Sequence, residues 1–308
     1  MRTLLSNGRR QSQVLKGPGS RPRRRRPALL SSLTAEAPLT SALTFLGAGR
    51  ITSALVAGLR LANYKLPLVV YDRNLRKPRA LRRQFQITIA HNLKSAIEQA
   101  ETVITAVRPT SVAGLLDEVA ASGVSRNPKL WISLAAGVPL RNLRKQLPAR
   151  WTRAMPSPVC RIGRGLTALC FGRNVSPRQR AAVRRFFSHV GQVLEIPEFQ
   201  FDAFTATYSS SHGCHALATL ADAAQRAGLD RPTALTAAAH ALSAGILYWK
   251  ETGQSLATLL HEAATPGGIA AATMSAMDRS GYARVVANGL KAGIAQARRN
   301  AKRRDQGI

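Results

Sequence analysis

Several features are scarce in this chain of 308 residues, and each scarcity excludes a class of protein. The three cysteines lie far apart without C-x-x-C spacing, which excludes a disulfide framework and a zinc knuckle. No uncharged apolar run reaches the roughly 18 residues of a membrane-spanning helix. Apolar (45%) and charged (19%) residues occur at ordinary globular levels, which excludes wholesale disorder. We therefore expect a folded cytoplasmic protein with no membrane partner and no bound metal.

Acidic residues are also scarce, with 15 Asp and Glu against 45 Lys and Arg, and the formal net charge is +30. Such an excess is typical of nucleic-acid partners, but its distribution argues against one here. Residues 1–34 carry +9 and residues 297–308 carry +4, which leaves +17 of the +30 for the rest of the chain. We expect residues 1–40 and 301–308 to be basic tails, the first disordered and solvated; contact with nucleic acid or anionic lipid is the less favoured alternative.

Short apolar runs alternate with helical patterns through the first half of the chain. The run at 43–46 leads directly into Gly47-Ala48-Gly49, then into a helical pattern and a second apolar run at 66–71. Further strands are expected at 87–90, 102–106, 130–134 and 152–155, and further helices at 78–84, 93–99, 111–121 and 140–147. This alternation predicts a doubly wound, Rossmann-type parallel sheet over residues 41–196.

The pattern changes after Pro197, where no further β-rich run occurs. Helices rich in Ala, Leu and Thr are expected at 217–228, 233–253, 255–264 and 270–277. A set of helices this apolar exposes much surface when it stands alone. We therefore expect an all-α dimerisation domain over residues 197–300.

The glycine turn at 47–49 carries the strongest chemical signal. Gly-x-Gly between a strand and a helix lets the backbone approach a pyrophosphate and directs helix N–H groups toward it. Thr52 stands at the third glycine position of the strict motif, so the context carries the prediction. Asp72 ends the next strand, where it can bind a ribose hydroxyl, which favours NADH. Arg73 is suited to a 2′-phosphate and favours NADPH, as does the excess of basic residues.

Two further segments have the character of ligand-binding loops. Val107-Arg108-Pro109 follows the fourth strand, at the sheet edge where ligands bind in open α/β folds. Thr265-Pro266-Gly267-Gly268-Ile269-Ala270 joins two helical stretches, and the consecutive N–H groups of such a turn can hold a carboxylate. Each segment also has a plain structural explanation, as a helix start or as a helix–helix turn.

Taken together, these segments resemble the pyrroline-5-carboxylate reductase family, the NAD(P)H enzymes of proline biosynthesis. The resemblance runs from about residue 43 to residue 299 and implies a homodimer or higher homo-oligomer with active sites formed between subunits. It rests on Gly47-Ala48-Gly49-Arg50-Ile51, Tyr71-Asp72-Arg73-Asn74, Ala106-Val107-Arg108-Pro109, Ala135-Ala136-Gly137-Val138, Arg153-Ala154-Met155-Pro156, Ala221-Asp222-Ala223-Ala224 with Gly228-Leu229, and Pro266-Gly267-Gly268.

The motifs and the resemblance together imply two groups of site residues. The expected cofactor residues are Gly47, Gly49, Arg50, Ile51, Asp72, Arg73, Val107, Arg108, Pro109, Ala136 and Ser157. The expected substrate residues are Thr265, Gly267, Gly268, Ile269 and Ala270. The backbone N–H groups of Gly267, Gly268, Ile269 and Ala270 are expected to hold the substrate carboxylate.

Several family positions are changed in this chain. Arg50 and Ser157 each replace an Asn, and residues 206–212 replace the family's Ser-Gly-x-x-Pro-Ala-Tyr segment. Ala270 occupies the position of a catalytic Thr, so the hydroxyl that the family offers the pyrroline ring is absent. We expect an NAD(P)H-dependent reductase of a cyclic imine, which reduces 1-pyrroline-5-carboxylate to proline by hydride transfer to C5, with slowed turnover. The alternative is a divergent member that binds dinucleotide but reduces another imine or acts as a regulatory protein.

Overall fold

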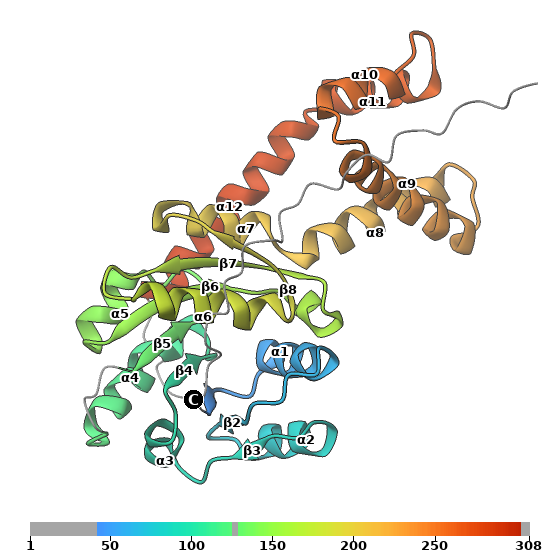
Figure 1. Cartoon of the computed structure of the whole chain (residues 1–308). Coiled ribbons are helices and arrows are strands. Elements are labelled where there is room, and N and C mark those ends of the chain that lie inside the picture. Colours follow the sequence, from blue (N-terminus) through green and yellow to red (C-terminus); the bar gives the residue numbers. More distant parts are fainter. Residues whose placement is uncertain (1–41, 125–128, 303–308) are drawn as a thin grey trace, which may run out of the picture. The chain divides into compact units, whose positions relative to one another are not determined.

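The computed structural model describes residues 42–124 and 129–302, so the expected tail at 1–40 and nearly all of the tail at 301–308 lie outside the described residues. The first part of the described chain is a sheet with helices between its strands (Figure 1). Its strands are β1 (Leu43–Leu46), β2 (Leu68–Tyr71), β3 (Thr88–Ile89), β4 (Thr102–Thr105), β5 (Leu130–Ser133), β6 (Arg150–Met155), β7 (Gly165–Phe171) and β8 (Gly191–Glu195). Its helices are α1 (Arg50–Leu61), α2 (Arg76–Gln84), α3 (Leu93–Glu98), α4 (Val112–Ala121), α5 (Leu140–Gln146) and α6 (Pro177–Ser188), with the 3-10 turns η1 (Pro109–Ser111) and η2 (Pro158–Ile162).

The strand order is β3-β2-β1-β4-β5-β6-β7-β8. β1 pairs in parallel with both β2 and β4, so that Leu43 lies opposite Leu68 on one side and Thr102 on the other. The chain therefore reverses its direction of winding between β1 and β4. In open α/β sheets, ligands bind beyond the carboxyl ends of the strands at such a reversal. The predicted doubly wound sheet is confirmed.

One strand runs against its neighbour. β7 pairs antiparallel with β6, with Met155 opposite Ala168, and β8 then pairs in parallel with β7. The connection from β6 to β7 contains only η2, which is too short for the crossover that two parallel strands require. The sequence pattern predicted no element between residues 156 and 196, so β7, α6 and β8 extend the expected sheet.

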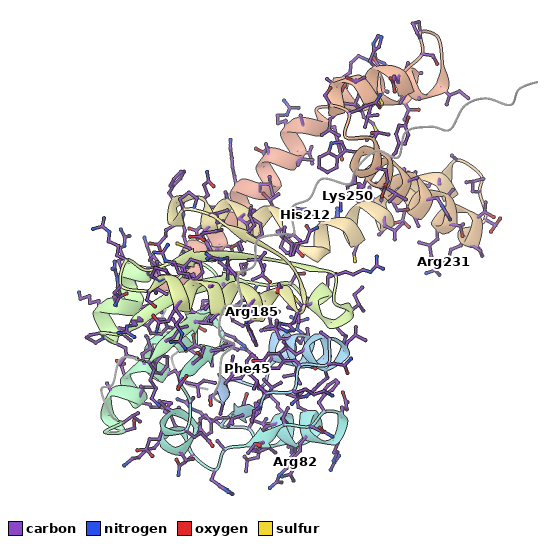
Figure 2. All side chains as sticks on the ribbon, viewed as in Figure 1. Phe45, Arg82, Arg185, His212, Arg231 and Lys250 are labelled. Carbon is purple, nitrogen blue, oxygen red and sulfur yellow. The ribbon has the colours of Figure 1, made fainter. Side chains whose placement is uncertain are left out.

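The sheet separates two apolar cores. Phe45 and Val70 pack on one face with residues of α1, α2, η2 and α6. Val103 and Trp151 pack on the other face with residues of α3, α4, α5 and the later helix α7 (Phe201–Thr207). Because successive strand residues point to opposite faces, the parallel strands are apolar on both sides. Phe45 lies inside this structure, whereas Arg82 of α2 is exposed (Figure 2).

Downstream of β8 the described chain is helical, which confirms the expected all-α part. It consists of η3 (Glu198–Gln200), α7, α8 (Ser210–Arg226), α9 (Arg231–Thr252), α10 (Leu256–Ala263), α11 (Ile269–Arg279) and α12 (Tyr282–Lys302). Few of its side chains are buried, and large apolar ones such as Ile246, Leu247 and Val285 are exposed. Apolar surface on this scale indicates a protein partner.

None of the described helices is long and apolar enough to cross a membrane. Within the same part of the chain, no three His, Cys, Asp or Glu side chains are grouped so that they could hold a metal ion.

Candidate functional site

The glycine turn between β1 and α1 forms one end of a cleft. Gly47 has φ +110°, and a Cβ there would lie 2.7 Å from the carbonyl oxygen of Ala106, so this position requires glycine. The Thr52 hydroxyl donates to the Gly47 carbonyl (2.7 Å), so the residue at the third motif position holds the turn. A Cβ on Gly49 would meet nothing within 4 Å, which shows that the turn faces open space. α1 begins without a side-chain cap, so its first N–H groups are available to an anion.

Asp72 follows β2 and lies against this turn. Its Oδ2 accepts a hydrogen bond from Ala48 N (2.8 Å), and its Oδ1 accepts one from Asn74 N (2.8 Å). The Lys77 ammonium lies 3.8 Å from Oδ2. These contacts hold the carboxylate where a ribose is expected, and a carboxylate has further lone pairs for ribose hydroxyls.

Positive charge gathers on the adjoining wall. α2 contains no acidic residue, and its basic residues are Arg76, Lys77, Arg79, Arg82 and Arg83. Lys77 lines the cleft, and so does Arg73, whose guanidinium pairs with Glu118 of α4. Two cations at this end of the cleft favour a phosphate group there.

The cleft as a whole has a volume of about 1210 Å³. This exceeds the ~300–1,000 Å³ of typical small-molecule sites, so an extended ligand such as a dinucleotide can be accommodated. Beyond the glycine turn and α2, its walls come from the ends of β4, β5 and β6 and from the end of α7. The residues they contribute include Ala106, Val107, Arg108, Leu134, Met155, Pro156, Ser157, Thr205, Tyr208 and Ser209.

Most of the predicted cofactor residues line this cleft. They are Gly47, Gly49, Arg50, Ile51, Asp72, Arg73, Val107, Arg108 and Ser157. Pro109, the first residue of η1, and Ala136, which follows β5, are not among its lining residues. The structure thus brings together residues from four separate loops, and their role toward a cofactor stays a prediction.

The predicted substrate residues, 265–270, do not line the cleft. They form the turn between α10 and α11, in which Gly267 has φ +77° and Gly268 N donates to Thr265 O (2.9 Å). The Gly268 N–H is therefore used within the turn. α11 begins at Ile269 without a side-chain cap, and Ile269 is 89% exposed. Within one chain, the turn and the cleft are not brought together.

Sequence reasoning missed Tyr208, which lines the cleft at the end of α7. Its phenol oxygen accepts hydrogen bonds from Leu166 N (2.6 Å) and from Ser157 Oγ (3.0 Å). The segment around Tyr208 was noted only because it departs from the family motif. Its place in the cleft depends on contact between α7 and β7, for which the local sequence carries no signal.

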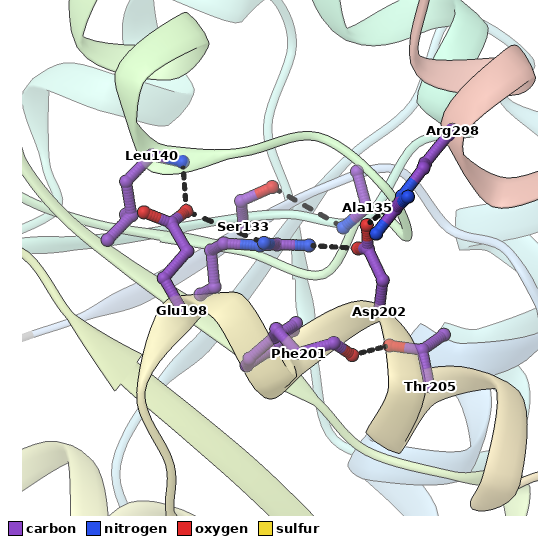
Figure 3. A network of polar contacts seen from close by, with 9 residues as sticks. Ser133, Ala135, Leu140, Glu198, Phe201, Asp202, Thr205 and Arg298 are labelled. Carbon is purple, nitrogen blue, oxygen red and sulfur yellow. Dashed lines mark hydrogen bonds and ion pairs between the residues drawn. The ribbon is translucent and has the colours of Figure 1, made fainter. Parts of the chain in front are cut away.

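An ionic network holds α7 against the sheet (Figure 3). The Arg153 guanidinium of β6 is buried, 3.5 Å from Glu198 Oε1, 3.6 Å from Asp202 Oδ1 and 4.1 Å from the centre of the Phe201 ring. Asp202 also pairs with Arg298 of α12 (3.2 Å). Burial lowers the pKa of Arg153, and the two carboxylates oppose that shift. The network fixes the α7 side of the cleft relative to β6.

Known proteins match this chain in both of its parts. The family models named "NADP oxidoreductase coenzyme F420-dependent" and "Pyrroline-5-carboxylate reductase dimerisation" match residues 42–137 and 198–300. The pyrroline-5-carboxylate reductase of Mycobacterium tuberculosis is 31% identical over 266 residues, which cover 78% of this chain and 90% of that protein.

Solved structures match as well. The 1-pyrroline-5-carboxylate reductase of Streptococcus pyogenes has a TM-score of 0.75 at 25% identity, covering 84% of this chain and 98% of that chain. The pyrroline carboxylate reductase of Plasmodium falciparum, solved with NADP bound, also has a TM-score of 0.75, at 21% identity and with 86% and 100% covered.

A cleft of this kind on a doubly wound sheet, followed by a helical dimerisation module, defines the class of NAD(P)-dependent oxidoreductases. Within that class, the identity to its relatives over most of its length is decisive. The chain belongs to the pyrroline-5-carboxylate reductase family.

Proposed function

We propose that the protein reduces 1-pyrroline-5-carboxylate to proline, with NADPH as the hydride donor and the imine carbon, which becomes C5 of proline, as the acceptor. The observation that carries the proposal is the single cleft in which the Gly47 turn, Asp72 and a pair of cations meet at the β1–β4 reversal. Relatives of about 30% identity bear the name of this activity.

The residues of the cleft fit a dinucleotide. The glycine turn leaves open the space that a Cβ on Gly49 would enter, and the uncapped start of α1 offers N–H groups to a pyrophosphate. In this proposal Asp72 accepts hydrogen bonds from a ribose, and Arg73 and Lys77, which line the same cleft, hold its 2′-phosphate. When bound, the dihydronicotinamide supplies the hydride. The chain contributes orientation and electrostatics.

We further propose that the substrate carboxylate binds to the 265–270 turn of a partner subunit. The N–H groups of Gly267, Ile269 and Ala270 are suited to this, because the Gly268 N–H is used within the turn. A homodimer is supported by the exposed apolar side chains of α9–α12 and by the dimerisation family model. In this proposal the boundary between the sheet domain and the helical domain falls at residues 196–197, between β8 and η3.

A direct assay tests the function. The purified protein, given NADPH and pyrroline-5-carboxylate, is expected to oxidise NADPH and form proline. Ala270→Thr restores a hydroxyl beside the ring, and one such hydrogen bond acting in the transition state raises turnover by about three- to tenfold. If both forms bind NADPH and neither turns over, the divergent binding protein becomes the better reading.

The cofactor choice is tested by reversing one charge. Lys77→Glu places a negative charge beside the expected 2′-phosphate, so NADPH affinity should fall by about tenfold or more, while NADH affinity falls less because Lys77 also pairs with Asp72. Arg83→Glu is the matched control, because Arg83 lies on the same helix but does not line the cleft. Calorimetric titration of both cofactors measures the effect. Equal losses in the two variants would contradict a local phosphate site.

A further inference from the structure

The Tyr208 hydroxyl has an unusual set of hydrogen bonds. Its oxygen accepts from Leu166 N and from Ser157 Oγ, so both bonds deliver hydrogen to the phenol. A phenol oxygen has two lone pairs and one proton of its own. With both lone pairs occupied, the proton is directed away from Leu166 and Ser157. No other side chain or backbone group among the described residues accepts it.

Two polar side chains of the cleft, Thr205 and Asp72, are committed elsewhere. Thr205 Oγ1 donates to Phe201 O (2.7 Å), so its proton is used within α7. Asp72 is the carboxylate among the lining residues, and it is held at the glycine turn with Lys77 beside it. Arginine side chains keep their protons at neutral pH. Tyr208 is thus the acid available beside Ser157, at the end of the cleft away from the ribose position.

We propose that Tyr208 is the proton donor of the imine reduction, a role that rests on the proposed function. As the imine carbon gains its new C–H bond by hydride transfer, the electron pair of the C=N π bond moves to the nitrogen. The nitrogen takes the phenolic proton of Tyr208, which leaves a neutral secondary amine. The resulting phenolate is stabilised by the N–H of Leu166 and the O–H of Ser157, and it regains a proton from water.

The test compares a neutral imine, whose nitrogen must gain a proton, with an N-methyl iminium, whose nitrogen needs none. Tyr208→Phe and the wild-type protein are assayed with NADPH against pyrroline-5-carboxylate, well above the pKa of its imine, and against a cyclic iminium methylated on nitrogen. A positioned acid contributes about 10²-fold or more, so kcat for the neutral imine should fall by that factor. The N-methyl iminium has a permanent charge, and its rate should be nearly unchanged. A purely structural tyrosine would slow both substrates alike.

Controls separate this proposal from the proposed function. Tyr64→Phe removes a buried hydroxyl that has no hydrogen-bond partner among the described residues and does not line the cleft, so it should leave both rates intact. NADPH affinity is measured for every variant. A wild-type protein that reduces neither substrate overturns the proposed function itself. If the wild-type protein reduces both substrates, two results overturn only the role of Tyr208. In the first, Tyr208→Phe is as fast as the wild type. In the second, it is slowed by the same factor on both substrates.

Discussion

At the scale of single residues, Cys170 has a measurable consequence for stability. It lies on β7, and burial together with the charge of Glu198 raises its pKa from 9.0 to about 11. The folded protein therefore favours the neutral thiol. The contribution of this thiol to the free energy of unfolding is fully present below pH 9. It is lost as the pH rises toward 11, because the thiol loses its proton at a lower pH in the unfolded chain than in the folded protein.

We predict that Cys170→Ala flattens the alkaline loss of stability. Between pH 9 and pH 11, the free energy of unfolding should fall less steeply in this variant than in the wild type. Urea denaturation across this range measures the slopes. Cys214→Ala, at an exposed position of α8, is the control and should follow the wild type. Parallel curves for Cys170→Ala and the wild type would refute the prediction.

At the scale of elements, a glycine joins the β5–α5 turn to the last helix. Gly137 has φ +75°, and a Cβ there would overlap the Ala297 carbonyl of α12. Gly123 has a similar φ of +64°, but its Cβ would meet open space. Both alanine variants bear the cost of a left-handed backbone, roughly 1–2 kcal/mol. Gly137→Ala should be destabilised by about 1–3 kcal/mol more, from the overlap alone. Urea denaturation measures the free energy of unfolding of both variants. Equal losses would mean that α12 can shift away from the new methyl group without a cost in stability.

Elements differ in how much of them the sequence predicts. The parallel strands β1, β4 and β5 are buried on both faces, so the sequence shows them as apolar runs. The carboxyl ends of β1 and β4 then locate Gly47 and Val107. The edge strand β8 includes Gln192 and Glu195 and leaves Leu194 exposed, so its pattern is weak. The direction of β7 follows from a short connection, and the position of Tyr208 follows from that strand. Tertiary contacts of this kind leave no periodic trace in the chain.

At the scale of the whole molecule, we predict a dimer at micromolar concentration. Leu247 of α9 is 59% exposed, and Leu61 of α1 is 64% exposed. Burying a leucine contributes roughly 1.5–3 kcal/mol, and a symmetric interface contains each residue twice. Leu247→Glu should therefore weaken dimerisation about a hundredfold or more, while Leu61→Glu should not. Light scattering over a dilution series reports both. A monomeric wild type would contradict the prediction.

The separation of the 265–270 turn from the cleft of its own chain has a genetic consequence. If each reaction centre draws on two polypeptides, a defect at Gly47 and a defect at Gly267 can be carried by different copies. Each defective protein alone is inactive. In a mixed dimer, one centre collects both defects and the other collects neither, so random reassociation of equal amounts restores about a quarter of normal activity. Two alleles that are each null would then support growth together, which a site contained within one chain does not allow.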